Sequence, residues 1–190
     1  KKRLSNLRLS TLLRPLADQG ISRVIGVDPA RNVLASIDDP RLTLINGFFD
    51  EKVAGEVIAK YGKVDMVMAN NVYAHIPDIQ GITRAVEKVL ADDGVFVFEV
   101  HYLGKVVDEM QYDMIYHEHL YYYSLVSAIA HFARYGMVVF DIKPVPIHAG
   151  SMRFYVARKT SRHAAQVSDA VKALERQERE RGFDRFETFQ

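Results

Sequence analysis

Two periodicities of apolar and polar positions alternate along the chain, one typical of strands and one of helices. Short apolar runs bounded by polar or turn residues predict β-strands at residues 23–28, 41–47, 64–71 and 94–102. Helical spacing of apolar residues predicts helices at residues 11–19, 30–37, 50–60 and 78–91. Alternation of this kind favours a parallel α/β sheet, in which we expect the run at 23–28 to be a buried, central strand.

The pattern changes after residue 102. Residues 103–123 are rich in aromatic and ionisable side chains without a clean period, which indicates a long functional loop with short helices. A helix at 124–135 follows, and strands at 137–145 and 152–159 flank the turn sequence PIHAGS, which predicts an antiparallel hairpin. A mostly parallel sheet that ends in such a hairpin is the arrangement of Rossmann-like class I methyltransferases.

Composition narrows the function classes. A chain of 190 residues, 48% hydrophobic and 26% charged, suits one folded domain with a short appendage. The 25 basic and 24 acidic residues give a net charge of +1, which disfavours a nucleic-acid partner. The absence of cysteine excludes thiolate sites from these residues, and no apolar run approaches the roughly 18 residues that span a bilayer. We therefore expect no membrane partner and a cytoplasmic location.

Polar and aromatic residues follow two of the first predicted strands. Asp28 and Pro29 end the run VIGVD, where a carboxylate is placed to accept hydrogen bonds from a ribose. The alternative is that Asp28 only starts a turn or caps the next helix. Phe48 and Phe49 follow the next strand and offer an aromatic wall for adenine, although they suit a core position equally well.

The next two predicted strands also end in chemistry-bearing residues. Asn70, Asn71 and His75 follow VDMVMA, where their side chains are expected to face a cleft. Glu99 and His101 share the parity of one strand face, so both are expected to point the same way. A carboxylate late in a buried strand needs a partner, and that partner can be structural.

The densest cluster is YDMIYHEH at residues 112–119, followed by three tyrosines. Its imidazoles, carboxylates and phenols suit acid–base chemistry near neutral pH. Two other interpretations stay open: a metal site, which needs ligands from elsewhere, and an aromatic loop packed on the sheet. His148, Ser151 and Arg153, near the predicted hairpin turn, can bind a phosphate or a sugar hydroxyl, although a small-residue turn needs no ligand.

These residues, in this order, resemble the sugar C-methyltransferase family, relatives of the 3-C-methyltransferases of nucleotide-linked 4-keto-deoxysugars. The segments that carry the resemblance are VIGVDPARNV (24–33), VMANNVYAHIPD (67–78), GVFVFEVHYL (94–103), YDMIYHEHLYYYSL (112–125) and PIHAGSMRFYV (146–156). It implies S-adenosylmethionine as cofactor, a nucleotide-linked keto-sugar as small-molecule substrate, and an enolate that attacks the sulfonium methyl. It also implies a zinc ion, but only in an N-terminal domain absent from these residues.

The resemblance assigns roles to the candidate residues. His119 is the implied base, with neighbours Tyr116, Glu118 and His75. The implied cofactor-binding residues are Asp28, Pro29, Phe48, Phe49, Asn70 and Asn71. The implied substrate-binding residues are Glu99, His101, Tyr102, His117, His148, Ser151 and Arg153, and no residue is assigned to a metal.

Two departures from the family pattern stand out. Where relatives begin with a strand and a glycine-rich loop, this chain has KKRLSNLRLSTLL, so that strand and loop are expected to be missing or degenerate. The second departure is the length of the chain. We expect a methyltransferase core over residues 1–158, with an incomplete N-terminal part, and a charged helical connector over 159–190 that leads to an absent C-terminal domain.

The alternative function is a catalytically silent sugar- or nucleoside-binding remnant. Oligomeric state is not readable from the pattern.

Overall fold

The β-strands form two sheets that lie in different units of the chain. A computed structural model describes residues 8–147 and 150–190. The chain divides into two compact units, Lys1–Val53 and Ala54–Gln190. The first holds a two-stranded sheet and the second a four-stranded sheet, so the single sheet expected from the alternating pattern is described as two.

The first unit alternates helix and strand as predicted. Its elements are α1 (Arg8–Asp18), β1 (Val24–Asp28), α2 (Arg31–Ala35) and β2 (Leu42–Asn46). Strands β1 and β2 pair in parallel from Val24↔Leu42 to Asp28↔Asn46. The expectation that β1 is central is wrong for the described residues, because its hydrogen-bonded partner strand there is β2 and the sheet has two members. Gly20 ends α1 with φ of +83°, a backbone conformation that favours glycine.

The second unit is built on a mixed sheet. Its helices and strands are α3 (Glu51–Tyr61, which begins in the first unit), β3 (Val64–Asn70), α4 (Ile79–Val89), β4 (Leu90–His101), α5 (Leu103–Asp108), α6 (Leu125–Ala133), β5 (Met137–Val145), β6 (Ser151–Arg158) and α7 (Asp169–Glu180). The strand order is β3-β4-β6-β5. Strands β3 and β4 are parallel, whereas β6 is antiparallel to both β4 and β5. The predicted C-terminal hairpin is therefore confirmed.

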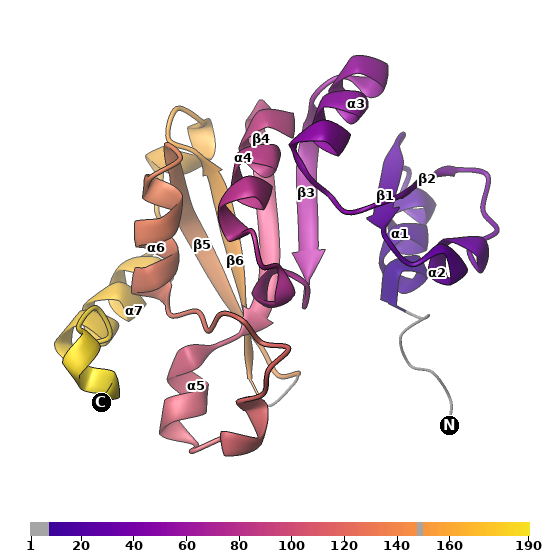
Figure 1. Cartoon of the computed structure of the whole chain (residues 1–190). Coiled ribbons are helices and arrows are strands. Elements are labelled where there is room, and N and C mark those ends of the chain that lie inside the picture. The colour runs from indigo at the N-terminus through magenta and orange to yellow at the C-terminus, as the bar shows by residue number, and fades with distance from the viewer. Residues whose placement is uncertain (1–7, 148–149) are drawn as a thin grey trace. The chain divides into compact units, whose positions relative to one another are not determined.

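An aromatic cluster forms the core of the second unit. Phe96 and Phe98 lie two residues apart on β4 and so share one face of the sheet. They pack with Tyr73 and with Phe132 of α6, at ring-centroid distances of 4.9 to 6.1 Å. Each of these four side chains is fully buried, and burial of one such ring contributes about 1.5 to 3 kcal/mol. Figure 1 shows α4 and α6 on the same face of this sheet.

The segment after β4 is an irregular loop with short helices, as predicted. Helix α5 is followed by a 3₁₀ turn at Tyr112–Met114, and the chain then runs without regular structure to Ser124. Figure 1 shows α5 beyond the ends of β3 and β4, where both strands finish. Ser124 and Ser127 form a reciprocal capping box that starts α6. The segment is thus held between two fixed elements, β4 and α6.

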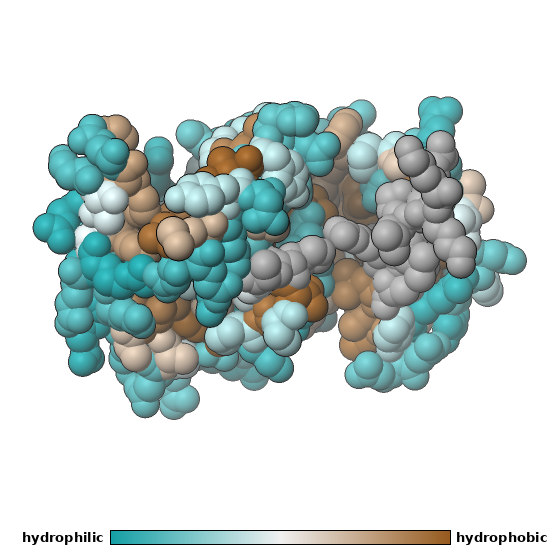
Figure 2. All heavy atoms as spheres, turned by 90° about the horizontal axis from the view of Figure 1, so that it is seen from below, coloured by the Kyte–Doolittle hydropathy of each residue, from teal (hydrophilic) through white to brown (hydrophobic). Residues whose placement is uncertain are grey.

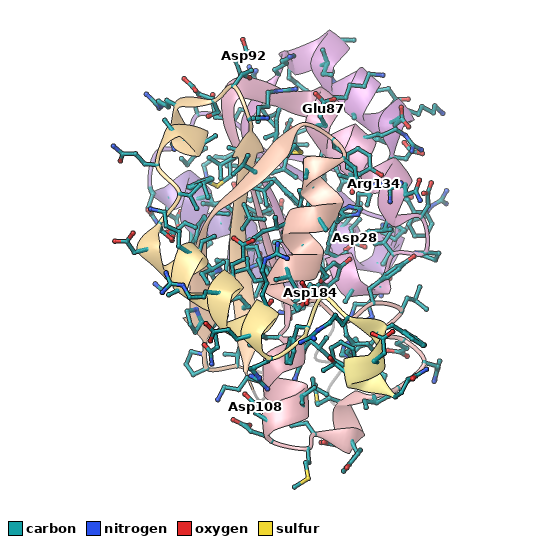
Figure 3. All side chains as sticks on the ribbon, turned by 90° about the vertical axis from the view of Figure 1, so that its left-hand side faces the viewer. Asp28, Glu87, Asp92, Asp108, Arg134 and Asp184 are labelled. Atoms are coloured by element: carbon teal, nitrogen blue, oxygen red, sulfur yellow. The ribbon has the colours of Figure 1, made fainter. Side chains whose placement is uncertain are left out.

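Helix α7 packs onto the second unit. The helix starts later than the charged helical connector expected from residue 159, because a 3₁₀ turn at Arg162–Ala165 comes first and Ser168 caps Asp169–Glu180. Its Val171 and Glu178 are buried. Just past the helix, Arg181 forms an ion pair with Asp108, which ends α5 and is labelled in Figure 3. No helix in the described ranges is long and apolar enough to cross a membrane.

Candidate active site

The loop that follows α5 is fastened to the end of β3 by its backbone. The N–H groups of Leu120 and Tyr121 both donate to the carbonyl of Ala74, at 3.0 and 3.3 Å. The Tyr121 hydroxyl donates to the carbonyl of Pro77 at 2.9 Å. Ala74 belongs to a 3₁₀ turn at Tyr73–His75 that directly follows β3. These contacts bring the YHEH run beside His75, although the two lie more than 40 residues apart in sequence.

His119 is held at both ring nitrogens. Its Nδ1 lies 3.2 Å from the carbonyl oxygen of Met114, and its Nε2 lies 2.9 Å from the hydroxyl of Tyr116. A carbonyl oxygen only accepts, so Nδ1 carries the proton in the neutral ring. Nε2 is then the basic nitrogen and accepts from the Tyr116 hydroxyl. The arrangement fixes one tautomer and directs its lone pair toward the phenol.

The surroundings of His119 favour its neutral form. Burial lowers the pKa of the His119 imidazole below 6.5, the contact with the Met114 carbonyl opposes this, and the neighbouring His75 and His101 lower the pKa further. A His119 with a lowered pKa is unprotonated at neutral pH and can therefore act as a general base.

His75 and Glu118 complete the predicted cluster in different ways. The rings of His75 and His119 lie 4.9 Å apart. The His75 Nδ1 lies 2.7 Å from the backbone carbonyl of Glu118, so it is the protonated nitrogen of the neutral ring. The Glu118 side chain itself is exposed, as is His117. Glu118 thus positions His75 through its backbone.

Glu99 forms a buried network at the end of β3 and β4. Its carboxylate accepts from the Arg153 guanidinium at 2.6 Å and from the Asn71 amide at 3.2 Å. Asn71 adopts a φ of +53°, and its backbone N–H donates to the Glu99 carbonyl. Glu99 is 1% exposed, so this is the structural partner that a buried carboxylate needs. By contrast, the neighbouring Asn70 Oδ1 is buried without a hydrogen-bond partner among the described residues.

The other predicted substrate-binding residues that the structure describes lie near the end of β4 and the start of β6, where His101 pairs with Ser151 and Glu99 with Arg153. His101 is buried and lies 6.4 Å from His119, ring to ring. The Tyr102 hydroxyl donates instead to Glu178 at 2.6 Å. Ser151 is buried on β6 and donates to the carbonyl of Ile147 at 3.3 Å. His148 lies outside the described residues.

The predicted cofactor residues of the first unit lie at the strand ends, as expected. Asp28 Oδ1 accepts from the backbone N–H of Ala30 at 2.7 Å, the turn contact that the alternative interpretation requires. A carboxylate has further lone pairs, so this contact is compatible with a ribose contact. Pro29 and Phe48 are exposed and Phe49 is half-buried, so neither phenylalanine is a core residue.

Sequence reasoning missed the residues that hold the site from outside the motifs. Gln111 accepts from buried His101, and Glu178 accepts from Tyr102 and from two backbone N–H groups at the start of α6. Of these two residues, only Glu178 could have been noticed in the sequence. It lies one helical turn after apolar Leu174 and therefore on the apolar face of the predicted helix.

Apolar side chains of the 103–123 segment reach the surface around this site. The exposed members are Val107, Met110, Tyr112, Ile115, Tyr116 and Leu120. Figure 2 views the molecule from the side of α5 and shows apolar side chains interspersed with polar ones there. Within the described residues, no three His, Asp or Glu side chains are grouped closely enough to hold a metal ion.

Comparison with known proteins identifies the fold. A family model described as "Methyltransferase domain" matches residues 10–141. The chain is 36% identical over 160 residues to the C-methyltransferase NovU of Streptomyces niveus, an alignment that covers 84% of this chain and 38% of that protein. The chain therefore spans well under half the length of this relative.

Solved structures agree with the fold. One is a complex between the Haloferax volcanii Trm112 methyltransferase activator and a methyltransferase, with a TM-score of 0.60, 18% identity and 80% coverage of both chains. Another is the glycopeptide N-methyltransferase MtfA complexed with S-adenosyl-L-methionine, with a TM-score of 0.58, 14% identity and coverage of 80% and 79%. The chain has the class I methyltransferase fold and belongs to the methyltransferase-domain family.

Proposed function

We propose that this chain is the core of an S-adenosylmethionine-dependent C-methyltransferase that methylates a carbon next to the ketone of a nucleotide-linked deoxysugar. The observation that carries the proposal is the His119 imidazole, with Nδ1 held by the Met114 carbonyl and Nε2 facing the Tyr116 hydroxyl. Carbon methylation needs a base that makes a carbon nucleophile, and a neutral imidazole suits an acidic C–H beside a ketone. The 36% identity to a C-methyltransferase supports the same reaction class.

The proton transfer follows from the tautomer. His119 Nε2 takes the proton from the carbon next to the ketone as the Tyr116 hydroxyl gives up its place at that nitrogen. The electron pair of the broken C–H bond passes into the enolate. When bound, S-adenosylmethionine supplies the electrophilic methyl group. The enolate carbon would take that methyl group while the sulfur keeps the electron pair of the C–S bond, and the proton on His119 returns to solvent.

Tyr116 is the better donor to the enolate oxygen. A phenol hydroxyl can always donate a hydrogen bond. Neutral His75, in contrast, has its proton at Nδ1 on the Glu118 carbonyl, and its Nε2 offers only a lone pair. A donor aimed at developing negative charge typically contributes about 10²- to 10³-fold in kcat. We therefore assign Tyr116 to the enolate oxygen and His75 to the support of His119.

The chain's residues fit the cofactor in each unit separately. In the first unit, the Asp28 carboxylate at the end of β1 is proposed to accept from ribose hydroxyls. In the second, the unpartnered Asn70 Oδ1 at the end of β3 is the kind of buried acceptor that a bound polar ligand satisfies. Asn71, Pro29, Phe48 and Phe49 remain proposed cofactor contacts.

Methyl transfer from labelled S-adenosylmethionine to a nucleoside-diphosphate-linked 4-keto-6-deoxyhexose tests the proposal in the intact protein. We expect His119→Ala to abolish transfer and Tyr116→Phe to lower kcat about 10²-fold. His163→Gln is the control and should leave the rate of methyl transfer unchanged. His163 lies in the 3₁₀ turn before α7, where its ring stacks on that of Phe140. Full activity of His119→Ala would refute the base assignment. Sugar-nucleotide binding without turnover in the wild type would favour the silent remnant.

A further inference from the structure

A chain of three polar side chains runs from the surface of α5 to a buried histidine beside His119. Glu109 accepts from the Gln111 amide nitrogen at 2.7 Å, and the Gln111 Oε1 lies 2.8 Å from His101 Nε2. His101 and Gln111 are 6% and 9% exposed. The His101 ring lies 6.4 Å from that of His119, the proposed base. These contacts place His101 at the candidate site.

The network fixes the tautomer of His101. Lys105 hydrogen-bonds Glu109 at 2.8 Å and lowers the pKa of its carboxyl, so Glu109 is an ionised acceptor. An acceptor must face the NH₂ end of the Gln111 amide, which leaves the amide oxygen toward His101. An amide oxygen only accepts, so His101 carries its proton at Nε2. In the neutral ring Nδ1 is then a bare acceptor.

The bare nitrogen is without a partner. His101 Nδ1 is buried and has no hydrogen-bond partner among the described residues. Buried acceptors of this kind are rare in folded proteins, because desolvation without a hydrogen bond costs free energy. His101 is also the last residue of β4, at the strand end where ligands bind in open α/β sheets. An unpartnered acceptor at that position is suited to a hydrogen bond from a ligand.

We propose that His101 determines substrate specificity by accepting, at Nδ1, a hydrogen bond from a hydroxyl group of the methyl acceptor. Gln111 and Glu109 act as positioning residues that keep the proton on Nε2. This inference rests on the proposed function, which supplies an acceptor rich in hydroxyl groups. A site with a buried acceptor discriminates against an analogue that lacks the matching donor, because the acceptor then stays unpaired.

The first arm of the test reads the tautomer without any substrate. ¹⁵N-resolved NMR of the histidine rings is expected to show His101 as the Nε2–H form in the wild type. Gln111→Met removes the amide oxygen and should produce a mixture of the two tautomers, whereas His163→Gln should leave the His101 signals unchanged. A wild-type ring in the Nδ1–H form would overturn the proposal.

The second arm measures discrimination in the intact protein. The probes are a nucleoside-diphosphate-linked 4-keto-6-deoxyhexose and its analogues that each lack one ring hydroxyl, compared by calorimetric Kd and by KM and kcat. We expect one analogue to bind to the wild type about 10- to 100-fold more weakly than the parent substrate. In His101→Phe the Kd values of this analogue and of the parent should become nearly equal, and the variant's loss with the parent substrate should be mainly a higher KM. His163→Phe should keep the ratio.

The outcomes separate the two proposals. If the wild type turns over the substrate and His101→Phe keeps the same ratio of analogue to parent Kd, the role of His101 is overturned and the proposed function stands. Binding that depends on one hydroxyl and on His101, without turnover of any probe, would support His101 and refute the proposed reaction. Failure to bind any probe would contradict both.

Discussion

Replacement of Glu178 tests how α7 is fixed to the second unit. Its side chain is fully buried and accepts from the Tyr102 hydroxyl at 2.6 Å and from the N–H groups of Leu125 and Val126 at 2.9 and 2.8 Å. Glu178→Ala leaves three buried donors without an acceptor. At about 1 to 1.5 kcal/mol for each donor, the loss is about 3 to 4.5 kcal/mol in the free energy of unfolding.

The assay is urea unfolding followed by circular dichroism at 222 nm, which suits a chain without tryptophan. With a urea dependence of about 1 to 3 kcal/mol per molar, the midpoint should fall by about 1 to 4.5 M. Glu175→Ala is the matched control on the same helix, because its ion pair with Arg179 lies near the surface and contributes about 0 to 1 kcal/mol. Equal urea midpoints for the two variants would show that Glu178 does not stabilise the packing of α7.

The remaining predictions concern buried charge and pH. Arg153→Met leaves the buried carboxylate of Glu99 without its cation and should lower the free energy of unfolding, measured in urea, by about 3 kcal/mol. The further change Glu99→Gln should restore most of this loss. If the effects of the two substitutions on the free energy of unfolding simply add, the two side chains do not stabilise each other. Burial lowers the pKa of His131 below the unfolded value of 6.5, so its contribution to stability is complete above that pH and is lost as pH falls through the folded pKa. The thermal midpoint of the wild type should therefore fall as the pH is lowered from 7.5 to 5, and it should fall less in His131→Gln. An equal fall in the two proteins would show that His131 does not cause this pH dependence.

The order of strands and helices was readable from sequence because each element follows a local period. The apolar alternation in GVFVFEVHY predicts β4, and PIHAGS between two apolar runs predicts the hairpin. The division into two sheets was not readable, because a sheet depends on which strands hydrogen-bond and not on each strand's own pattern. The local period also placed the start of the last helix too early, since Ser161 caps a separate 3₁₀ turn and Ser168 caps the helix itself.

The sequence predicted the ionisable side chains of the candidate site but not the groups that hydrogen-bond to them. The YHEH run was interpreted as acid–base groups and His75 as a cleft-facing residue, and the structure brings His119, Tyr116 and His75 together. The carbonyls of Met114 and Glu118, which fix the tautomers, are invisible in a sequence because every residue has one. Gln111 was missed because its role depends on a contact made only after the loop folds back.

The central claim is that His119 removes a proton from the carbon beside a ketone, and hydrogen exchange tests that step without methyl transfer. The intact protein is incubated with a nucleoside-diphosphate-linked 4-keto-6-deoxyhexose and S-adenosylhomocysteine in D₂O, and deuterium at that carbon is followed by NMR. We expect deuterium exchange with the wild type and with His163→Gln, and none above background with His119→Ala. Exchange at the wild-type rate in His119→Ala would contradict the central claim.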